Sequence, residues 1–210
     1  MMMKRVLLIG VIAFSASLLF GQSQKIVGDC TVTYAISSDN DSLSKALDNT
    51  TKTLYVRGKE VRSDLQSPIF LQSVIYNAMT GNAVILKEVN GIKYMSSLDS
   101  AKWRMYNNDY NGMNVTLSNE SKTILGYECK KATATLKDGS VMNIYYATDI
   151  APSTPENQFQ FKDIPGFVLE YDSKTEDKKS SIVYTATSIN LMPVPAYKFT
   201  IPTRGYRILQ

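Results

Sequence analysis

The side chains that could do nucleophilic or acid–base chemistry are few in this sequence. Histidine is absent from all 210 residues, which removes Ser-His-Asp triads, Cys-His pairs and histidine-ligated zinc sites together. Ser42 and Lys45 have the Ser-x-x-Lys spacing of penicillin-binding enzymes. However, the triplet Ser38-Asp39-Asn40 precedes this pair instead of following it, and the sequence contains no Lys-Thr-Gly. We therefore do not expect an acyl-enzyme mechanism.

Carboxylates and amides form two further patterns. A pair such as Glu128 and Glu170 could support glycoside hydrolysis without histidine, but each alternates with apolar neighbours as a solvent-facing strand residue does. Residues 107–112, Asn-x-Asp-x-Asn-Gly, resemble the first half of a calcium loop, yet Ser118 stands at the twelfth position, where a bidentate glutamate is expected. The sequence thus predicts no catalytic residue, no metal site and no cofactor, and we expect a protein that is not an enzyme.

The N-terminus has the three parts of a secretory signal peptide. Lys4 and Arg5 are followed by an apolar run over residues 6–20 and then by the small residues Gly21 and Ser23. The run is shorter than the roughly 20 apolar residues that a membrane-spanning helix needs. We expect a cleaved signal peptide over residues 1–23, a single domain over residues 24–210, and a periplasmic or secreted mature chain without a transmembrane segment.

The charge of the mature chain is nearly balanced. Removing Lys4 and Arg5 from the 23 basic residues leaves 21, against 19 acidic residues. A net charge near +2 gives no basis for nucleic-acid binding or for a strongly charged membrane-binding face.

The two cysteines, Cys30 and Cys129, are the only ones in the chain. Cys30 lies too far beyond the apolar run, and follows Asp29, so we do not expect a lipoprotein. Two cysteines in an exported chain predict one disulfide, which would close a loop of about 100 residues and stabilise the fold by up to about 4–5 kcal/mol. Two unpaired buried thiols are the alternative.

Alternation of apolar and polar residues predicts a mostly β fold. Residues 28–37 alternate and form the first expected strand. Residues 39–49 have the spacing of a short helix, with a long loop as the alternative. Short strands then follow one another, with turn signals such as Asn90-Gly91 between them. Strands are expected at 53–57, 59–65, 69–76, 83–89 and 92–98, which indicates an antiparallel meander.

The second half of the chain is predicted around the segment 122–150. It reads as two long strands joined at Asp138-Gly139, a pair that accepts the positive φ of a tight turn. Before it, residues 99–121 lose periodicity and are expected to form a partly ordered flap. After it comes a loop over 151–166 with three prolines, which no regular strand tolerates. Residues 167–171 and 180–190 are expected to pair as further strands.

Three stretches resemble a known group of exported bacterial proteins. They are Ile124–Ala132 (ILGYECKKA), Ile164–Tyr171 (IPGFVLEY) and Phe199–Tyr206 (FTIPTRGY). The group comprises the GLPGLI proteins and allied domains of unknown function, whose fold is thought to be like that of the lipoprotein carrier LolA. The GLPGLI strand entry is Gly-Leu-Pro-Gly-Leu-Ile, whereas residues 163–168 are Asp-Ile-Pro-Gly-Phe-Val, so a sister group fits equally well.

The resemblance implies a strongly curved antiparallel sheet, an open or half β-barrel of LolA-like fold, covered by short helices or loops. The flap residue Trp103 and one set of alternating strand residues would then line a ligand site on the concave side. That set is Val32, Tyr34, Leu71, Ile75, Leu86, Tyr94, Met142, Ile144, Tyr146, Leu169 and Tyr184.

Two functions follow from these expectations. The first is a non-catalytic cell-envelope protein that holds a lipid, a lipidated protein or another apolar ligand under the sheet, where each buried CH₂ would contribute about 0.8 kcal/mol. The second is an interaction or sensor module with a filled core, no small ligand and a protein partner in the envelope. The size and lining of the space beside the sheet distinguish them.

Overall fold

A computed structural model describes residues 23–175 and 179–209 of the chain. The expected signal peptide lies outside these residues, apart from its last residue, and remains a prediction. The described part of the chain contains fourteen strands, two α-helices and two 3₁₀ helices. None of its helices has the length and apolar character that would take it across a membrane.

The first half of the chain forms a regular meander after a short leading strand. Its elements are β1 (Lys25–Val27), β2 (Asp29–Ser38), α1 (Asp41–Ala46), β3 (Thr51–Arg57), β4 (Glu60–Gln66), β5 (Phe70–Asn77), β6 (Asn82–Val89) and β7 (Ile92–Leu98). The predicted strands and the short helix in this half are confirmed. Asn90 and Gly91 both have positive φ, 50° and 76°, as the predicted tight turn requires.

The second half begins with a helical segment and continues with the remaining strands. Its elements are α2 (Ser100–Tyr106), η1 (Asn108–Tyr110), β8 (Asn114–Ile124), β9 (Tyr127–Thr135), β10 (Val141–Ala147), β11 (Ile150–Pro152), β12 (Phe167–Lys174), β13 (Ser181–Asn190), η2 (Ala196–Phe199) and β14 (Arg207–Leu209).

The sequence prediction was wrong at three places in this half. The loop expected over 151–166 begins inside the short strand β11. The expected flap contains the long strand β8, and the strand expected from residue 122 is interrupted by a turn at Leu125-Gly126. Both turn residues have positive φ, 53° and 82°, which for leucine is uncommon because of its Cβ.

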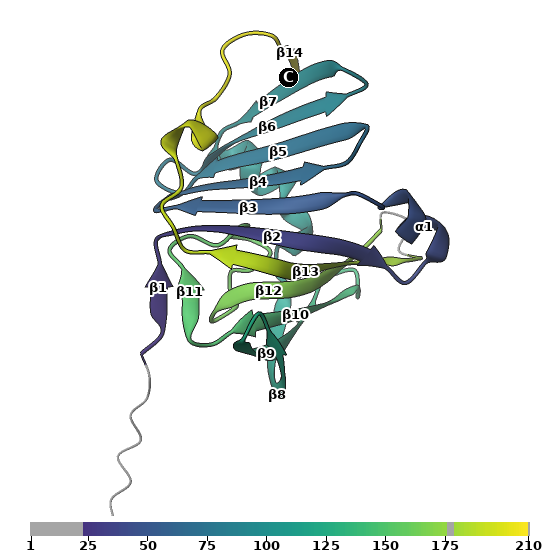
Figure 1. Cartoon of the computed structure of the whole chain (residues 1–210), viewed down its shortest axis with the longest axis vertical. Coiled ribbons are helices and arrows are strands. Elements are labelled where there is room, and N and C mark those ends of the chain that lie inside the picture. The colour runs from purple at the N-terminus through teal and green to yellow at the C-terminus, as the bar shows by residue number, and fades with distance from the viewer. Residues whose placement is uncertain (1–22, 176–178, 210) are drawn as a thin grey trace, which may run out of the picture.

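Twelve of the described strands form one sheet, in the order β14-β7-β6-β5-β4-β3-β2-β13-β12-β10-β9-β8. Every pair is antiparallel except β14 with β7, so the sheet is mixed and mostly antiparallel. The short strands β1 and β11 pair separately and in parallel. Figure 1 shows β2 and β13 side by side in the middle of the sheet, although residues more than 140 positions apart pair there.

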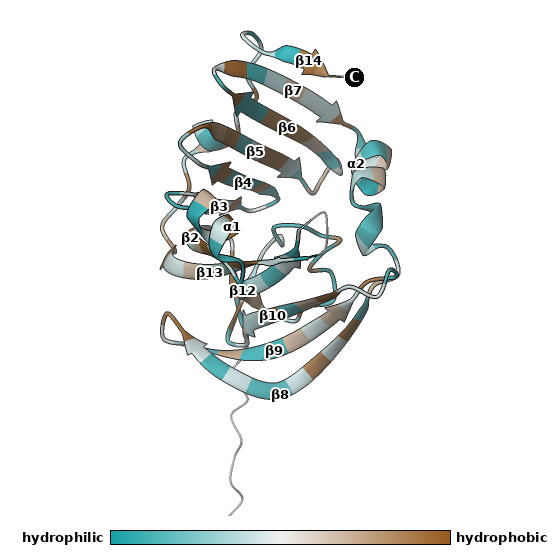
Figure 2. Ribbon diagram, turned by 90° about the vertical axis from the view of Figure 1, so that its right-hand side faces the viewer, coloured by the Kyte–Doolittle hydropathy of each residue, from teal (hydrophilic) through white to brown (hydrophobic). Residues whose placement is uncertain are grey.

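The predicted mostly β fold, with short helices and loops over an open sheet, is confirmed, but the sheet is not strongly curled. The strands from β2 to β7 pair without a register shift. Because bulges are what bend a sheet sharply, this half stays regular. Among the described strand pairs, irregularities occur only at β13–β2, β10–β12 and β8–β9. Figure 2 shows β14 and β8 at opposite ends of the sheet, and they do not pair.

The predicted disulfide is not formed. Cys30 and Cys129 are both free and fully buried. Cys30 lies on β2 and Cys129 on β9, with β13, β12 and β10 between them. Four strand spacings amount to about 19 Å along the sheet, whereas the Cα atoms of a disulfide lie about 4–7 Å apart. The alternative of two unpaired buried thiols is therefore the correct one.

Each face of the sheet is covered over part of its area. On one face, Ile75 and Leu86 pack against Val194 and Phe199 of the C-terminal tail; we call it the tail face. The opposite face, which includes Tyr34 and Tyr76, is covered by α2 and by residues 153–166, which we call the cover loop. Figure 1 shows α2 behind the sheet.

Candidate functional site

A buried ion pair lies at the centre of the face that α2 and the cover loop cover. Lys52 is 6% exposed, and its Nζ lies 2.5 Å from Oε1 of Glu156 in the cover loop. Lys52 occupies an inward position of β3, in the series Lys52, Leu54, Val56, whose members are all buried. The residues paired opposite it, Tyr34 on β2 and Leu65 on β4, lie on the same face. We call this the site face.

Tyrosine rings surround the buried ammonium. Nζ of Lys52 lies 5.5, 4.7 and 4.9 Å from the ring centroids of Tyr34, Tyr171 and Tyr184, and it donates a hydrogen bond to the Tyr171 hydroxyl. Tyr171 and Tyr184 are stacked, with ring centroids 4.7 Å apart. Such contacts stabilise a desolvated cation, so they partly compensate Lys52 for its removal from water.

The tyrosine hydroxyls are held in their neutral form. Burial raises the pKa of Tyr34 and Tyr171 well above the ordinary range, and the charge of Glu156 raises both further. Burial also raises the pKa of Tyr184, again with a contribution from Glu156. The Tyr34 hydroxyl donates to the carbonyl oxygen of Val168 at 2.9 Å. These groups therefore supply aromatic faces and neutral hydrogen-bonding groups at neutral pH.

Two cavities meet at Glu156. The inner cavity, about 200 Å³, lies between the sheet and α2 and is lined by Lys52, Tyr76, Trp103, Tyr171 and Tyr184 among others. The loop cavity, about 210 Å³, lies under the cover loop. It is mostly apolar, with Tyr34, Leu54, Phe161, Ile164, Phe167 and Val168 in its walls. Glu156 lines both cavities.

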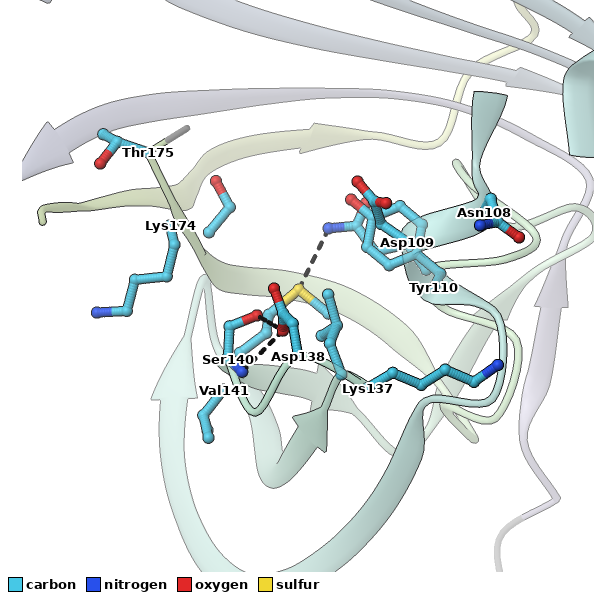
Figure 3. A pocket seen from close by; sticks show the side chains of 13 residues that line it. Asn108, Asp109, Tyr110, Lys137, Asp138, Ser140, Val141, Lys174 and Thr175 are labelled. Carbon is cyan, nitrogen blue, oxygen red and sulfur yellow. Dashed lines mark hydrogen bonds between the residues drawn. The ribbon is translucent and has the colours of Figure 1, made fainter. Parts of the chain in front are cut away.

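A third hollow adjoins the inner cavity on its other side. This outer pocket, about 510 Å³, has charged residues in its wall, among them Asp109, Lys137 and Lys174. Figure 3 shows the ammonium groups of Lys137 and Lys174 pointing away from each other. Gln160 lines both the outer pocket and the inner cavity, and its Nε2 contacts Sδ of Met142 at 3.2 Å. Glu156 and Gln160 thus stand at the two junctions between three successive hollows.

The cover loop is attached to α2 and to the sheet by polar contacts. Nδ2 of Asn157 donates to Oδ1 of Asn107 at 2.7 Å, and the Thr154 hydroxyl donates to the carbonyl oxygen of Gly58 at 2.9 Å. The Tyr76 hydroxyl donates to Gln158. Trp103 packs between Tyr76 and Tyr106, with ring centroids 6.0 and 5.5 Å away. Helix and loop therefore form one connected cover over the cavities.

The structure brings together only part of the predicted ligand-binding set. Four of its residues line the three hollows: Tyr34, Trp103, Met142 and Tyr184. Four others are buried in the core and line none of the three hollows: Val32, Ile144, Tyr146 and Leu169. Tyr94 is on the site face by its register with Lys87, two strands beyond the inner cavity.

The remaining three predicted residues, Leu71, Ile75 and Leu86, point to the tail face. Ile75 is paired with Arg62 and Leu86 with Ser73, positions that alternate with those facing the cavities. Two of them pack under the tail. The sequence showed that these residues share one face of their strands. It did not show that this face is opposite to the one that carries Tyr34 of β2.

Sequence reasoning missed Lys52 and Glu156. Lys52, Leu54 and Val56 occupy every second position of one strand, so Lys52 shares a face with two apolar residues. This pattern could have identified it. Glu156 lies in an aperiodic loop and gave no signal.

The patterns considered in the sequence for catalysis and metal binding lie elsewhere. Ser42 and Lys45 are exposed on α1. Glu128 is exposed, while Glu170 is half-buried and accepts from Lys122 and Thr185. Neither lines the three hollows.

The calcium-like segment is built into the cover. Asn107 is buried, and its side-chain oxygen is already occupied by Asn157. Across residues 23–175 and 179–209, no three acidic or cysteine side chains gather as a metal site would require.

The sequence matches no protein family and no curated protein. Among solved structures, the chain is similar to PNGF-II in two crystal forms. The TM-scores are 0.52 and 0.54 at 14% and 12% identity, and the alignments cover 86% and 87% of this chain. The chain spans about a third of the length of PNGF-II, since the alignments cover 30% and 32% of that protein.

A second similarity extends over nearly a whole protein. An uncharacterized conserved protein from Thermus thermophilus aligns with a TM-score of 0.50 and 7% identity, over 87% of this chain and 90% of that one. MucB (TM-score 0.39, 11% identity) and a putative outer membrane lipoprotein-sorting protein domain from Vibrio parahaemolyticus (0.24, 8%) also align, at scores too low to carry an argument. At these identities, the similarity to PNGF-II and to the Thermus protein concerns the fold alone.

Proposed function

We propose that this protein is exported to the cell envelope and holds an apolar ligand, such as a lipid, between its sheet and its cover, without catalysing a reaction. The predicted signal peptide supports the location. The observation that carries the ligand proposal is the pair of cavities that lie between the site face and its cover.

The cavity sizes set a condition on binding. Cavities of about 200 and 210 Å³ are each smaller than the roughly 300–1,000 Å³ of most small-molecule sites. A chain-like ligand therefore needs the side chains of Glu156 and Gln160 to move, which would join the three hollows into one groove. Ten buried CH₂ groups would then contribute about 8 kcal/mol, corresponding to a dissociation constant of about 1 μM before other costs.

The direct test is to purify the protein from its native envelope and to analyse it by native mass spectrometry. A bound lipid, seen as an added mass released on unfolding, is the expected result. An empty protein that also fails to bind added lipid would contradict the proposal. Co-purification of a protein in place of lipid would favour an interaction module.

A cavity-filling variant tests whether the ligand occupies the inner cavity, and a surface variant is its matched control. Val74 lines the inner cavity, so Val74→Phe should lower lipid occupancy while keeping the fold. Ile69 is 74% exposed, and Ile69→Phe should leave occupancy unchanged.

A further inference from the structure

We infer that the ligand carries an anionic group, a carboxylate or a phosphate, which binds Lys52 in place of the Glu156 carboxylate. This inference rests on the proposed function and specifies its ligand class. In the empty protein, Glu156 would occupy the position that the ligand's head group takes.

The two partners of the buried pair differ in how firmly they are held. Lys52 lies on β3, which is paired on both sides by β2 and β4, and its ammonium is enclosed by three rings. Glu156 belongs to the cover loop, and its side chain is 13% exposed. Its only other described partner is the Ser63 hydroxyl, which donates to Oε1 at 2.9 Å. The cation is therefore the fixed partner and the carboxylate the one that can move.

The displaced carboxylate has a place to go. Glu156 also lines the loop cavity, and so does Lys162, an exposed residue of the same loop. A rotation toward that side would bring Glu156 nearer to solvent and to a second ammonium. Movement of Glu156 would thus join the inner and loop cavities. In the same step, the anionic group of the ligand would replace Glu156 as the partner of the Lys52 ammonium.

Burial explains why the new partner must be charged. If Glu156 left without replacement, Lys52 would keep the Tyr171 hydroxyl and the three rings but would lose its only counter-ion among the described residues. Leaving one charge of a buried pair uncompensated is strongly destabilising. A neutral apolar molecule would impose that cost, whereas an anionic amphiphile would not.

The experiment compares ligands that share a tail and differ in the head group. Dodecanoate, dodecyl phosphate and dodecanol are titrated against the full mature chain. The signal is the fluorescence of Trp103, the single tryptophan, which lines the inner cavity. We expect both anions to bind at least about tenfold more tightly than dodecanol, because a charge-assisted contact with a buried ammonium is worth more than one from a neutral hydroxyl. The stronger of the two anions identifies the head group.

Variants of the pair give opposite expectations. Glu156→Gln should tighten anion binding by about tenfold, because a neutral amide competes less well for Lys52. Lys52→Met should weaken anion binding by at least the same factor, whereas Lys52→Arg should restore much of it. Lys131→Met, which breaks the exposed pair of Lys131 with Glu120, is the control and should bind like the wild type.

The outcomes separate this inference from the proposed function. Equal affinity for the three ligands, with no selective effect of either variant, would overturn the inference and leave a purely apolar site. If the wild-type chain binds none of the ligands, the proposed function fails and the inference fails with it. Circular dichroism and thermal unfolding of each variant establish that a loss of binding is not a loss of fold, and Glu156→Gln retains the test if Lys52→Met does not fold.

Discussion

The stability of the protein should depend on Lys52 and Glu156 as a coupled pair, in an unequal way. Glu156→Gln leaves an ammonium that is 6% exposed with one hydroxyl and three rings. Breaking a buried pair costs about 3–5 kcal/mol, and the cation–π contacts offset part of it, so we expect a loss of about 2–3 kcal/mol. Lys52→Met leaves a carboxylate that keeps Ser63 and can turn toward solvent, so its cost should be about 1–2 kcal/mol.

The double variant Lys52→Met/Glu156→Gln removes both charges and should cost less than Glu156→Gln alone. Urea unfolding of the four proteins forms a double-mutant cycle, from which we expect a coupling of about 2 kcal/mol. The same cycle on Lys131 and Glu120, an exposed pair at 3.0 Å, should give less than about 1 kcal/mol. If the costs of the two single variants simply add, the two charges are not coupled. If Lys52→Met costs more than Glu156→Gln, the carboxylate is not the partner that can turn toward solvent.

Three other outcomes follow from the structure. A Cβ at Gly166 would lie 2.1 Å from a backbone carbonyl oxygen of β10, so Gly166→Ala should lower the free energy of unfolding by about 3 kcal/mol or more. Gly28→Ala, where nothing lies within 4 Å, should leave it nearly unchanged in the same urea titration; equal effects would contradict the packing argument. Burial raises the pKa of the Cys30 thiol to about 12 and that of Cys129 to about 11, whereas an unfolded thiol ionises near pH 8.5. The folded state therefore binds more protons above that pH, and stability should fall between about pH 9 and 10 by up to about 1.4 kcal/mol per pH unit for each thiol. The double variant Cys30→Ala/Cys129→Ala should lose this slope, and a slope that persists would assign it to other groups. Leu125 has a positive φ, which costs a leucine about 1 kcal/mol and costs a glycine little, so Leu125→Gly should raise the melting temperature. A lower melting temperature would mean that the packing of the leucine side chain contributes more than the backbone strain removes.

Much of the fold could be predicted because the signals in the first half are local. The Asn90-Gly91 turn and the alternation in residues 53–98 each depend on neighbours in sequence, and both are found in the structure. Strand β8 was missed because most of its side chains are exposed on both faces, so it shows no apolar period.

The site was harder to predict, because its parts are brought together by strand order. Sequence periodicity placed Tyr34 and Tyr184 inward, but it could not show that β13 lies beside β2, nor that three strands separate Cys30 from Cys129. Lys52 was not considered, although its position in a series with Leu54 and Val56 indicated that it is buried.

The pairing of β2 with β13 has a consequence for how the protein assembles. Ser38 is paired with Ile182 and Thr31 with Asn190, so the N-terminal strand of the sheet must keep one edge unpaired until nearly the whole chain has been made. The meander β3–β7 and the hairpin β8–β9 can form from local contacts, whereas this long-range pairing is entropically expensive and should be the slow step of folding. Lys52 lies on one side of that junction, and Tyr171, Tyr184 and Glu156 are contributed from the other. The buried pair and the tyrosines around it therefore come together only when β13 has paired with β2, so a chain in which they have formed has also completed its sheet.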